Sequence, residues 1–388
     1  MSRRAAIIVL DGVGIGAATD AHHYGDAGSD TLGNMSRAIP GFALPALEAL
    51  GLGTLAPITG LSPSVAGQAA RCTMQPASPG KDSTTGHWEL CGLHLVRPFP
   101  TYPGGFPPEV VAEFARLTGR GVVANVAGGG TAVIDTYGQE HLATGAWILY
   151  TSADSVFQVA AHEDVVPLTE LYAACRVARE LLRPPHDVSR VIARPFLGCP
   201  GTWRRTANRR DFSLEPPGET LLDALAAAGI ERKGVGKIDD LFGGRSITSV
   251  HTADNAEGLR EIRTWIDGPE SGLLFANLVD FDQQFGHRND ALGFYGALRQ
   301  FDGALPGLIA LLHEDDLLIL TADHGNDPTT PSTDHARERA PMLMTGRRVR
   351  PVHLGERSTY SDLGATVGEW FGLSFRGAGT SFLAQVLA

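Results

Sequence analysis

Lysine is scarce in this 388-residue chain. Only three of its 32 basic residues are lysines, at Lys81, Lys233 and Lys237, and all the others are arginines. An ammonium is more compact than a guanidinium, so each lysine is a candidate for a site that needs a small cation. The net charge of −11 and the pI near 5.6 argue against general binding of nucleic acid or anionic membranes, although a local basic pocket could hold a phosphate.

Cysteine is also scarce, and long apolar runs are absent. The four cysteines show neither Cys-x-x-Cys pairing nor regular spacing, so we expect buried, reduced thiols. The apolar stretch over residues 5–10 is too short for a signal peptide. No run approaches the roughly 18 apolar residues of a membrane span. The sequence therefore predicts a cytoplasmic protein with no membrane partner.

Apolar residues make up 43% of the sequence, which is enough for a large core and two domains. Short apolar runs typical of buried strands alternate with patterns typical of helices, some followed by a glycine stop signal. This alternation predicts an α/β fold with a mostly parallel sheet covered by helices on both faces. The expected strands are residues 5–10, 147–150, 188–193, 273–279 and 317–320, and the expected helices are 109–118, 168–182, 220–228, 291–313 and 362–371.

Two proline-rich stretches divide the chain. One contains Pro98, Pro100 and Pro103, and the other contains Pro216 and Pro217. The segment between them is long enough to have a core of its own. We therefore expect residues 1–97 and 215–388 to form one discontinuous domain, and residues 98–214 to form an inserted α/β cap.

Aspartate and histidine side chains cluster after three of the predicted strands. Ligands bind at the carboxyl ends of strands in α/β sheets, and carboxylate with imidazole suits divalent ions such as Mn²⁺ or Zn²⁺. A single such residue is usually a cap or a turn former, but three clusters in equivalent positions favour a site for two metal ions. The six residues are Asp11, Asp282, His287, Asp323, His324 and His335.

Three hydroxyl side chains follow an aspartate in the segment Pro79-Gly-Lys-Asp-Ser-Thr-Thr-Gly-His-Trp-Glu89. A hydroxyl needs a base or a metal ion to act as a nucleophile at neutral pH, and backbone amides at the start of a helix can face a phosphate. The same pattern also fits a Ser/Thr capping loop with a nearby glutamate. Beside six candidate metal ligands, the nucleophile interpretation is favoured.

These motifs resemble, in order, those of the prokaryotic phosphopentomutases, a metal-dependent family of the alkaline phosphatase superfamily. The string Thr-Ala-Asp-His-Gly from Thr321 marks only the superfamily, whereas Gly-Lys-Asp from Gly80 and Tyr-Thr-Ser-Ala-Asp-Ser from Tyr150 are much more specific. The resemblance runs from about residue 6 to Gly379-Thr-Ser-Phe-Leu383. It implies an alkaline-phosphatase-like core with an inserted cap.

The resemblance also implies two Mn²⁺ ions and a nucleophile directly after the aspartate of Gly-Lys-Asp, which is Ser83 here. Family members usually have threonine at this position, so the oxygen is kept and the methyl group that stiffens χ1 is lost. The implied ligands of the first ion are Asp11, Asp323, His324 and Ser83. The implied ligands of the second ion are Asp282, His287 and His335.

Five residues are implied to contact the substrate. An aspartate would accept hydrogen bonds from a sugar hydroxyl, and two arginines would grip the distal phosphate as bidentate forks. The sequence departs from the family at Asn125-Val126, where a lysine is expected after the asparagine; this departure concerns the cap loop rather than the core reaction. The five residues are Asp154, Arg194, Arg209, Lys237 and Lys81.

The implied activity is the interconversion of ribose or deoxyribose 1-phosphate and 5-phosphate in nucleoside catabolism. It would proceed through a phosphoserine enzyme and a pentose 1,5-bisphosphate, which also serves as activator, while the cap keeps water from the phosphoenzyme. The alternatives are a metal-dependent phosphatase, another superfamily mutase such as a phosphoglycerate mutase, and a non-catalytic phosphosugar-binding protein. A monomer or weak homo-oligomer is expected.

Overall fold

The computed structural model describes residues 3–152 and 154–387. These residues form two compact units. The first unit consists of Met1–Pro98 and Pro216–Ala388, and the second is Phe99–Glu215. Each unit contains its own sheet and its own helices. The helices that the structure describes are all too short or too polar to cross a membrane.

The first unit is built on a sheet of eight strands within the described residues. Strand β13 is antiparallel to both of its neighbours, and all the other described pairs in this sheet are parallel. The predicted mostly parallel α/β sheet is therefore confirmed. In spatial order the strands are β10 (Thr248–Val250), β9 (Arg232–Val235), β11 (Gly272–Leu278), β1 (Arg4–Leu10), β12 (Asp316–Thr321), β13 (Ala340–Thr345), β2 (Ala70–Met74) and β14 (His353–Arg357).

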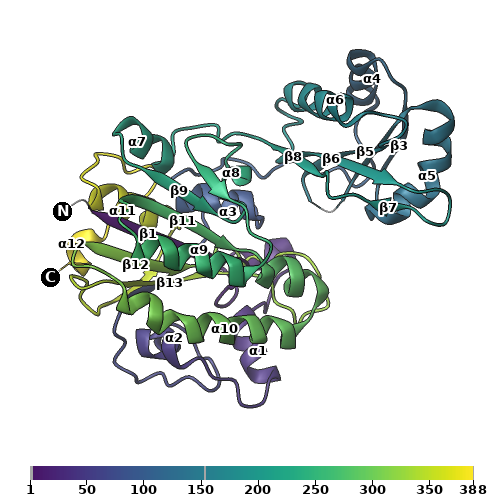
Figure 1. Cartoon of the computed structure of the whole chain (residues 1–388). Coiled ribbons are helices and arrows are strands. Elements are labelled where there is room, and N and C mark those ends of the chain that lie inside the picture. The colour runs from purple at the N-terminus through teal and green to yellow at the C-terminus, as the bar shows by residue number, and fades with distance from the viewer. Residues whose placement is uncertain (1–2, 153, 388) are drawn as a thin grey trace. The chain divides into compact units, whose positions relative to one another are not determined.

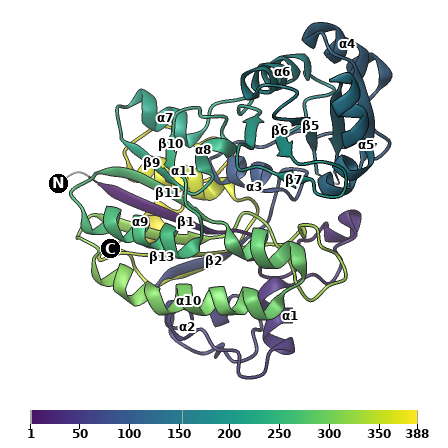
Figure 2. The same ribbon diagram turned by 45° about the vertical axis from the view of Figure 1, so that its right-hand side comes forward.

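Helices cover both faces of this sheet (Figures 1 and 2). One layer contains α2 (Pro45–Leu50), α9 (Asn255–Asp267) and α10 (Ala291–Ala310), which contact one another through α10. The other layer contains α3 (Ser83–Leu90), α7 (Leu221–Ala227), α8 (Ile238–Leu241) and α11 (Ser361–Trp370). The shorter elements are η1 (Ala21–Tyr24), α1 (Thr31–Ala38), η2 (Leu52–Thr54), η3 (Phe281–Phe285), η4 (Gly286–Arg288) and α12 (Leu383–Val386).

Local capping explains where several helices begin. Thr220 and Asp223 form a reciprocal capping box at the start of α7, which supplies two otherwise unpaired backbone amides with acceptors. The side chain of Asp290 accepts a hydrogen bond from the amide of Gly293 at 2.9 Å and starts α10. The expected helices over residues 220–228 and 291–313 are thus confirmed, with α10 ending slightly earlier than expected.

The three central strands β11, β1 and β12 end together. They are buried along their whole length, as expected for parallel strands covered on both faces. Leu10 of β1 pairs with Leu278 of β11, and Val9 pairs with Thr321 of β12. Residues that follow these strands therefore leave the sheet at one edge, which is where ligands bind in such sheets.

The second unit has a mixed sheet of its own. Its helices are α4 (Pro108–Thr118), α5 (Gly130–Thr144) and α6 (Leu168–Leu181). The strands, in spatial order, are β3 (Val122–Ala127), β4 (Trp147–Thr151), β5 (Val156–His162), β6 (Arg190–Leu197) and β7 (Arg204–Arg205), and β8 (Arg210–Ser213) also pairs with β6.

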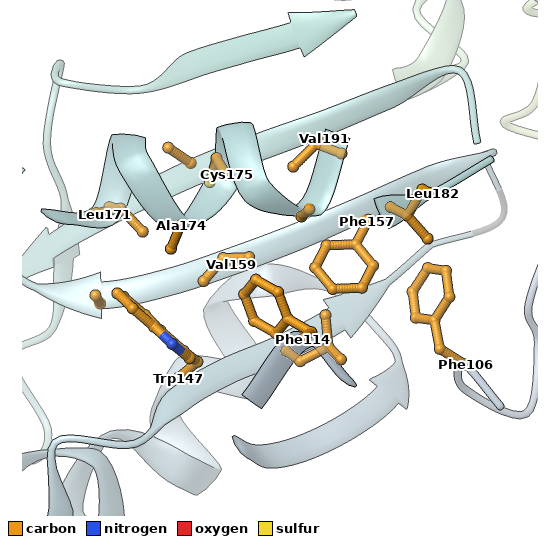
Figure 3. Close-up of a cluster of buried hydrophobic side chains, with 14 of the residues drawn as sticks. Phe106, Phe114, Trp147, Phe157, Val159, Leu171, Ala174, Cys175, Leu182 and Val191 are labelled. Carbon is orange, nitrogen blue, oxygen red and sulfur yellow. The ribbon is translucent and has the colours of Figure 1, made fainter. Parts of the chain in front are cut away.

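Apolar residues cover both faces of this second sheet. Along β4, Trp147 and Leu149 join one buried cluster, while Ile148 and Tyr150 join another, because successive side chains of a strand point to opposite faces. In the larger cluster, the rings of Phe114 and Phe157 lie edge to face at a centroid distance of 5.1 Å (Figure 3). The unit therefore has its own hydrophobic core.

The cysteine prediction is wrong at one position. Cys72, Cys91 and Cys175 are buried as expected, but Cys199 is exposed. Cys199 lies in a turn after β6, where its carbonyl accepts a hydrogen bond from the amide of Thr202 at 2.8 Å. Cys199 is exposed because it lies in a surface turn and is not packed among apolar side chains.

Candidate metal centre and nucleophile

Three buried carboxylates lie where the central strands end. Asp11 follows β1, Asp282 lies in the π-helical turn η3 after β11, and Asp323 follows β12. Their exposed fractions are 0%, 4% and 2%. Burying three negative charges together is unfavourable unless cations or hydrogen-bond donors surround them. The edge of the sheet is therefore a site that attracts positive charge.

One group of potential ligands consists of Asp11, Asp282 and His324, whose ligand atoms all lie within 4.8 Å of one another. Nε2 of His324 is 3.3 Å from Asp11 Oδ1 and also 3.3 Å from Asp323 Oδ2. Burial alone would lower the pKa of His324, but the charges of the two aspartates outweigh it and raise the pKa to about 10. Asp11 and Asp323, both expected for the first ion, thus contact His324, but the group within 4.8 Å contains Asp282 in place of Asp323.

A second group consists of Asp282, His287 and His335, again within 4.8 Å. Nε2 of His287 is 3.2 Å from Asp282 Oδ2, and Nε2 of His335 is 3.4 Å from Asp282 Oδ1. Burial would raise the pKa of Asp282, but His335 and His287 outweigh it and hold the pKa well below its ordinary value. Asp282 therefore belongs to both groups, whereas the family resemblance implied it for the second ion alone.

Outer hydrogen bonds orient these ligands. Nδ1 of His287 donates to the carbonyl of Thr333 at 2.7 Å, and Nδ1 of His324 donates to that of Gly325 at 3.0 Å. These bonds leave Nε2 of each ring directed at the carboxylates, which is the usual arrangement around a metal-binding histidine. The side-chain amide of Asn326 donates through Nδ2 to Asp282 Oδ1 at 2.6 Å; sequence reasoning missed this residue, although it lies within the motif that begins at Thr321.

The donor set fits a divalent metal ion. Among the residues that the structure describes, both carboxylate oxygens of Asp11, Oδ2 of Asp323 and Nε2 of His335 are buried and make no hydrogen bond of normal geometry. Their close neighbours are charged or ionisable groups at 2.6–3.4 Å. Buried polar atoms in proteins are normally satisfied, and oxygen and imidazole nitrogen atoms that converge in this way suit Mn²⁺ or Zn²⁺.

Ser83 lies beside these ligands at the first position of α3. Its Oγ is 3.2 Å from Nε2 of His324, and Nζ of Lys237 donates to it at 3.3 Å. The same ammonium lies 2.6 Å from Asp11 Oδ2. The Thr85 hydroxyl has a different partner, because it donates to the carboxylate of Asp82, the residue that caps α3, at 2.6 Å. Of these two hydroxyl groups, that of Ser83 is the one placed against the Asp and His cluster.

The loop before Ser83 is held by two buried charged side chains that the sequence did not single out as functional. Arg337 donates to the carbonyls of Pro76 and Ser78 at 2.8 and 2.6 Å. The carboxylate of Glu89 accepts from the amides of Ala77 and Ser78 at 2.8 and 2.7 Å. Opposite charges thus satisfy the backbone of this loop from two sides and limit the positions open to the nucleophile.

Lys81 is paired with two carboxylates. Its Nζ lies 3.1 Å from Asp26 Oδ2 and 3.2 Å from Asp334 Oδ2. Asp334 precedes His335 and accepts a hydrogen bond from its backbone amide at 2.8 Å. The ammonium therefore connects the loop before the nucleophile with the segment that carries a candidate metal ligand.

The remaining predicted contacts lie in the second unit. Arg194 on β6 donates through Nε to Gln158 at 3.0 Å, and burial, with a contribution from Arg209, lowers its pKa to about 10. Arg209 donates to both carboxylate oxygens of Asp211 at 2.7 Å. Asp154 lies two residues before the start of β5. The structure thus brings the two arginines into one electrostatic environment within this unit.

Two further residues share that environment and were missed. Burial raises the pKa of Tyr150, although Arg194, Arg205 and Arg209 act in the opposite direction. The Tyr150 hydroxyl is buried and makes no hydrogen bond among the described residues. Tyr150 opens a string that resembles the family, and this position was the available signal for it.

The class of this protein follows from these features and from the matching family model. The chain matches the metalloenzyme superfamily over residues 3–375. It is 54% identical over 388 residues to the phosphopentomutase of Anaeromyxobacter dehalogenans, with 100% of both chains covered. It is 53% identical over 386 residues to that of Carboxydothermus hydrogenoformans, with 99% of each covered.

The chain therefore belongs to the phosphopentomutase family of the metalloenzyme superfamily, as its motifs predicted. Among solved structures, the PH0037 protein from Pyrococcus horikoshii is 14% identical, with a TM-score of 0.49 over 97% of this chain and 98% of that chain.

Proposed function

We propose that the protein interconverts the 1-phosphates and 5-phosphates of ribose and deoxyribose. The observation that carries this proposal is the position of the Ser83 hydroxyl, next to His324 and Lys237 and beside three buried carboxylates. Relatives more than 50% identical over the whole chain carry the name phosphopentomutase. We further propose that it works in the cytoplasm on soluble pentose phosphates, as a monomer or weak homo-oligomer.

Two Mn²⁺ ions are the proposed cofactors. The first would be held by Asp11, Asp323, His324 and Ser83, with Asp282 also within reach, and the second by Asp282, His287 and His335. Bound at these positions, the ions would supply positive charge against the phosphate and favour the deprotonated form of a nearby hydroxyl.

The side chains then position the reacting groups. The phosphoryl group leaves Ser83 for the free end of a pentose monophosphate, so that one P–O bond breaks as another forms and a pentose 1,5-bisphosphate results. The phosphate at the other end returns to Ser83. Lys237 lies close enough to the Ser83 oxygen to contact the transferred group and to balance its charge. A sugar 1,5-bisphosphate would also prime the unphosphorylated enzyme.

The second unit is proposed as the cap, over approximately residues 98–214. Arg194 and Arg209 would hold the distal phosphate through paired N–H donors, and Asp154 would accept hydrogen bonds from the sugar. Lys81 stays a candidate contact, although its ammonium is paired with Asp26 and Asp334. Exclusion of water by the cap would make phosphoryl transfer to sugar faster than hydrolysis.

Product analysis tests this function. Metal-stripped protein is incubated with ribose 1-phosphate, Mn²⁺ and a trace of ribose 1,5-bisphosphate, and ribose 5-phosphate and inorganic phosphate are both measured. We expect ribose 5-phosphate with little free phosphate, and no product with a chelator. Release of phosphate instead would identify a phosphatase, and turnover of 3-phosphoglycerate alone another mutase. Absence of any turnover would favour a binding protein.

The nucleophile is tested by mapping the phosphorylated peptide after incubation with the bisphosphate. Ser83→Ala should abolish labelling, whereas Thr84→Ala and Thr85→Ala should still be labelled. Phosphate on Thr84 or Thr85 of the unmodified protein would overturn the assignment to Ser83.

A further inference from the structure

We propose that His87 is a positioning residue that links the nucleophile to Asp323, a proposed metal ligand, through the hydrogen on its Nδ1 atom, while Asn277 faces the other ring nitrogen. The effect on catalysis rests on the proposed function, but the arrangement itself does not. His87 is fully buried on α3, one helical turn after Ser83. Asn277 on β11 is 1% exposed. Neither residue is among the candidate metal ligands.

The neighbours of the His87 ring determine which nitrogen carries hydrogen. Nδ1 lies 2.8 Å from the carbonyl oxygen of Ser83 and 3.1 Å from Oδ2 of Asp323. A carbonyl oxygen and a carboxylate oxygen only accept hydrogen bonds, so Nδ1 must be the donor. Nε2 lies 3.3 Å from the side-chain amide nitrogen of Asn277. The ring therefore carries a hydrogen on Nδ1 and is flanked by Asn277 at its other nitrogen.

This single N–H group faces two parts of the site that are far apart in the sequence. The Ser83 carbonyl belongs to the first residue of α3, and the carboxylate of Asp323 follows β12. Because both oxygens lie within 3.1 Å of one nitrogen, the imidazole sets the separation between the nucleophile's backbone and the carboxylate. A change in that separation would move Ser83 relative to the metal ligands.

The carboxylate of Asp323 is held at both oxygens. Its Oδ1 accepts a hydrogen bond from the amide of Gly12 at 3.1 Å, while Oδ2 faces His87 on one side and Nε2 of His324 at 3.3 Å on the other. These three neighbours restrict the orientation of the carboxylate. Residues of this kind behind a metal ligand typically change metal affinity or activity by about 10–100-fold when mutated.

A purely structural role would be different. His87 also packs near the ring of Phe275, with a centroid distance of 5.6 Å, so it could simply fill space in the core. Packing depends on the volume of the side chain, whereas positioning depends on a hydrogen-bond donor at the place of Nδ1. Replacing His87 with asparagine or with glutamine distinguishes packing from positioning, because both side chains carry an NH₂ group but at different distances from the backbone. Asparagine places its NH₂ where Nδ1 lies, and glutamine reaches the place of Nε2 instead.

The test compares His87→Asn with His87→Gln. Mn²⁺ binding to metal-stripped protein is measured by titration calorimetry, and kcat and KM for ribose 1-phosphate are measured separately. We expect His87→Gln to lose about 10–100-fold in Mn²⁺ affinity and in kcat with little change in KM, and His87→Asn to recover most of both losses. Equal impairment of the two variants, or Mn²⁺ binding by His87→Gln as tight as in the unmodified protein, would overturn the proposal.

The tautomer is tested on the unmodified, metal-stripped protein, without any assay of activity. Nitrogen-15 chemical shifts of labelled histidine rings distinguish Nδ1–H, Nε2–H and doubly protonated forms, and the His87 signal is identified by its loss in His87→Gln or, if that variant does not fold, by through-bond assignment. We expect a hydrogen on Nδ1; a ring that carries hydrogen on Nε2 alone would refute the arrangement. A protein with hydrogen on Nδ1 and no mutase activity would contradict only the proposed function.

Discussion

Replacing Gly86 with alanine should destabilise the protein, whereas most glycine-to-alanine changes in helices stabilise it. Gly86 lies in α3, between the nucleophile and His87. A Cβ atom at this position would lie 2.1 Å from the carbonyl oxygen of Asp323, 2.8 Å from its carbonyl carbon and 2.9 Å from its Cβ. Two of these atoms are backbone and follow a central strand, so no rotation of a side chain can relieve the overlap.

The size of the effect follows from two opposing contributions. Alanine in a helix interior normally adds about 0.5–1 kcal/mol of stability over glycine. Forcing a methyl group into a packed interior costs about 1–3 kcal/mol, so we expect a net loss of about 1–2 kcal/mol. Because real Cβ atoms essentially never approach closer than 3.0 Å, α3 must shift by about 1 Å, and a misplacement of this size can lower the rate by about 10²-fold.

The same substitution at Gly296 is the control. Gly296 lies in α10, and a Cβ there would meet nothing within 4 Å in the described part of the chain. Gly296→Ala should therefore gain about 0.5–1 kcal/mol and keep its turnover. Stability is measured by denaturant unfolding, and turnover by formation of ribose 5-phosphate. A Gly86→Ala protein that is stabilised and fully active would refute the claim that α3 must approach the backbone of Asp323 this closely.

Three other predictions follow from single contacts. Asp323→Ala should abolish Mn²⁺ binding and turnover, whereas Asp280→Ala should mainly reduce stability by about 1 kcal/mol, because its carboxylate accepts from the first backbone amide of α9 at 2.8 Å; equal losses of turnover would contradict this. Only Cys199 should react rapidly with a thiol reagent in the native protein, since it is exposed while burial raises the pKa of Cys72 to about 12; a second fast thiol would contradict this. Lys237→Met should bind Mn²⁺ more tightly but turn over more slowly.

The parts of the fold that were predictable are those with a local signal. The central strands β1, β11 and β12 each contain a run of at least four apolar residues, and α7 and α10 have capping residues that can be recognised in the sequence. Strand β13 contains Pro341, which pairs with Thr73 of β2; proline is depleted in strands, and the pairing partner is distant in the sequence. Strand β9 is short and begins with charged residues. Strands β9 and β13 form because they pair with neighbouring strands that are distant in the sequence. No local sequence pattern reveals such pairing.

The same distinction applies to the site. The side chains that converge at the sheet edge could be proposed because each follows a strand or lies in a recognisable motif. The sequence analysis named Asp282 and not the nearby Asp280 as a candidate ligand, and the two side chains point in different directions in the structure. Asp280 turns back towards the start of α9, while Asp282, inside the π-helical turn, points to the histidines. Asn326 contacts Asp282 from 44 positions away, and such contacts cannot be read from spacing.

Lys237 shows how the buried carboxylates affect both metal binding and catalysis. Burial would lower its pKa, but the charges of Asp11 and Asp282 outweigh burial and raise it, so the residue presents an ammonium 2.6 Å from Asp11 Oδ2. A metal ion that binds Asp11 must share or displace this contact. Removing the ammonium should therefore strengthen Mn²⁺ binding, while turnover falls because the charge beside the Ser83 oxygen is lost.

Lys233→Met is the matched control for this prediction. Lys233 lies on β9, and its Nζ is 3.6 Å from Glu261 with about a third of each side chain exposed. Exposed pairs of this kind contribute about 0–1 kcal/mol, so Mn²⁺ affinity and turnover should stay unchanged. If Lys237→Met instead lowered both Mn²⁺ affinity and turnover, the ammonium would be supporting the metal ligands rather than competing with the metal for them. Competition between the ammonium and the metal ion requires that Lys237→Met raises Mn²⁺ affinity and lowers turnover.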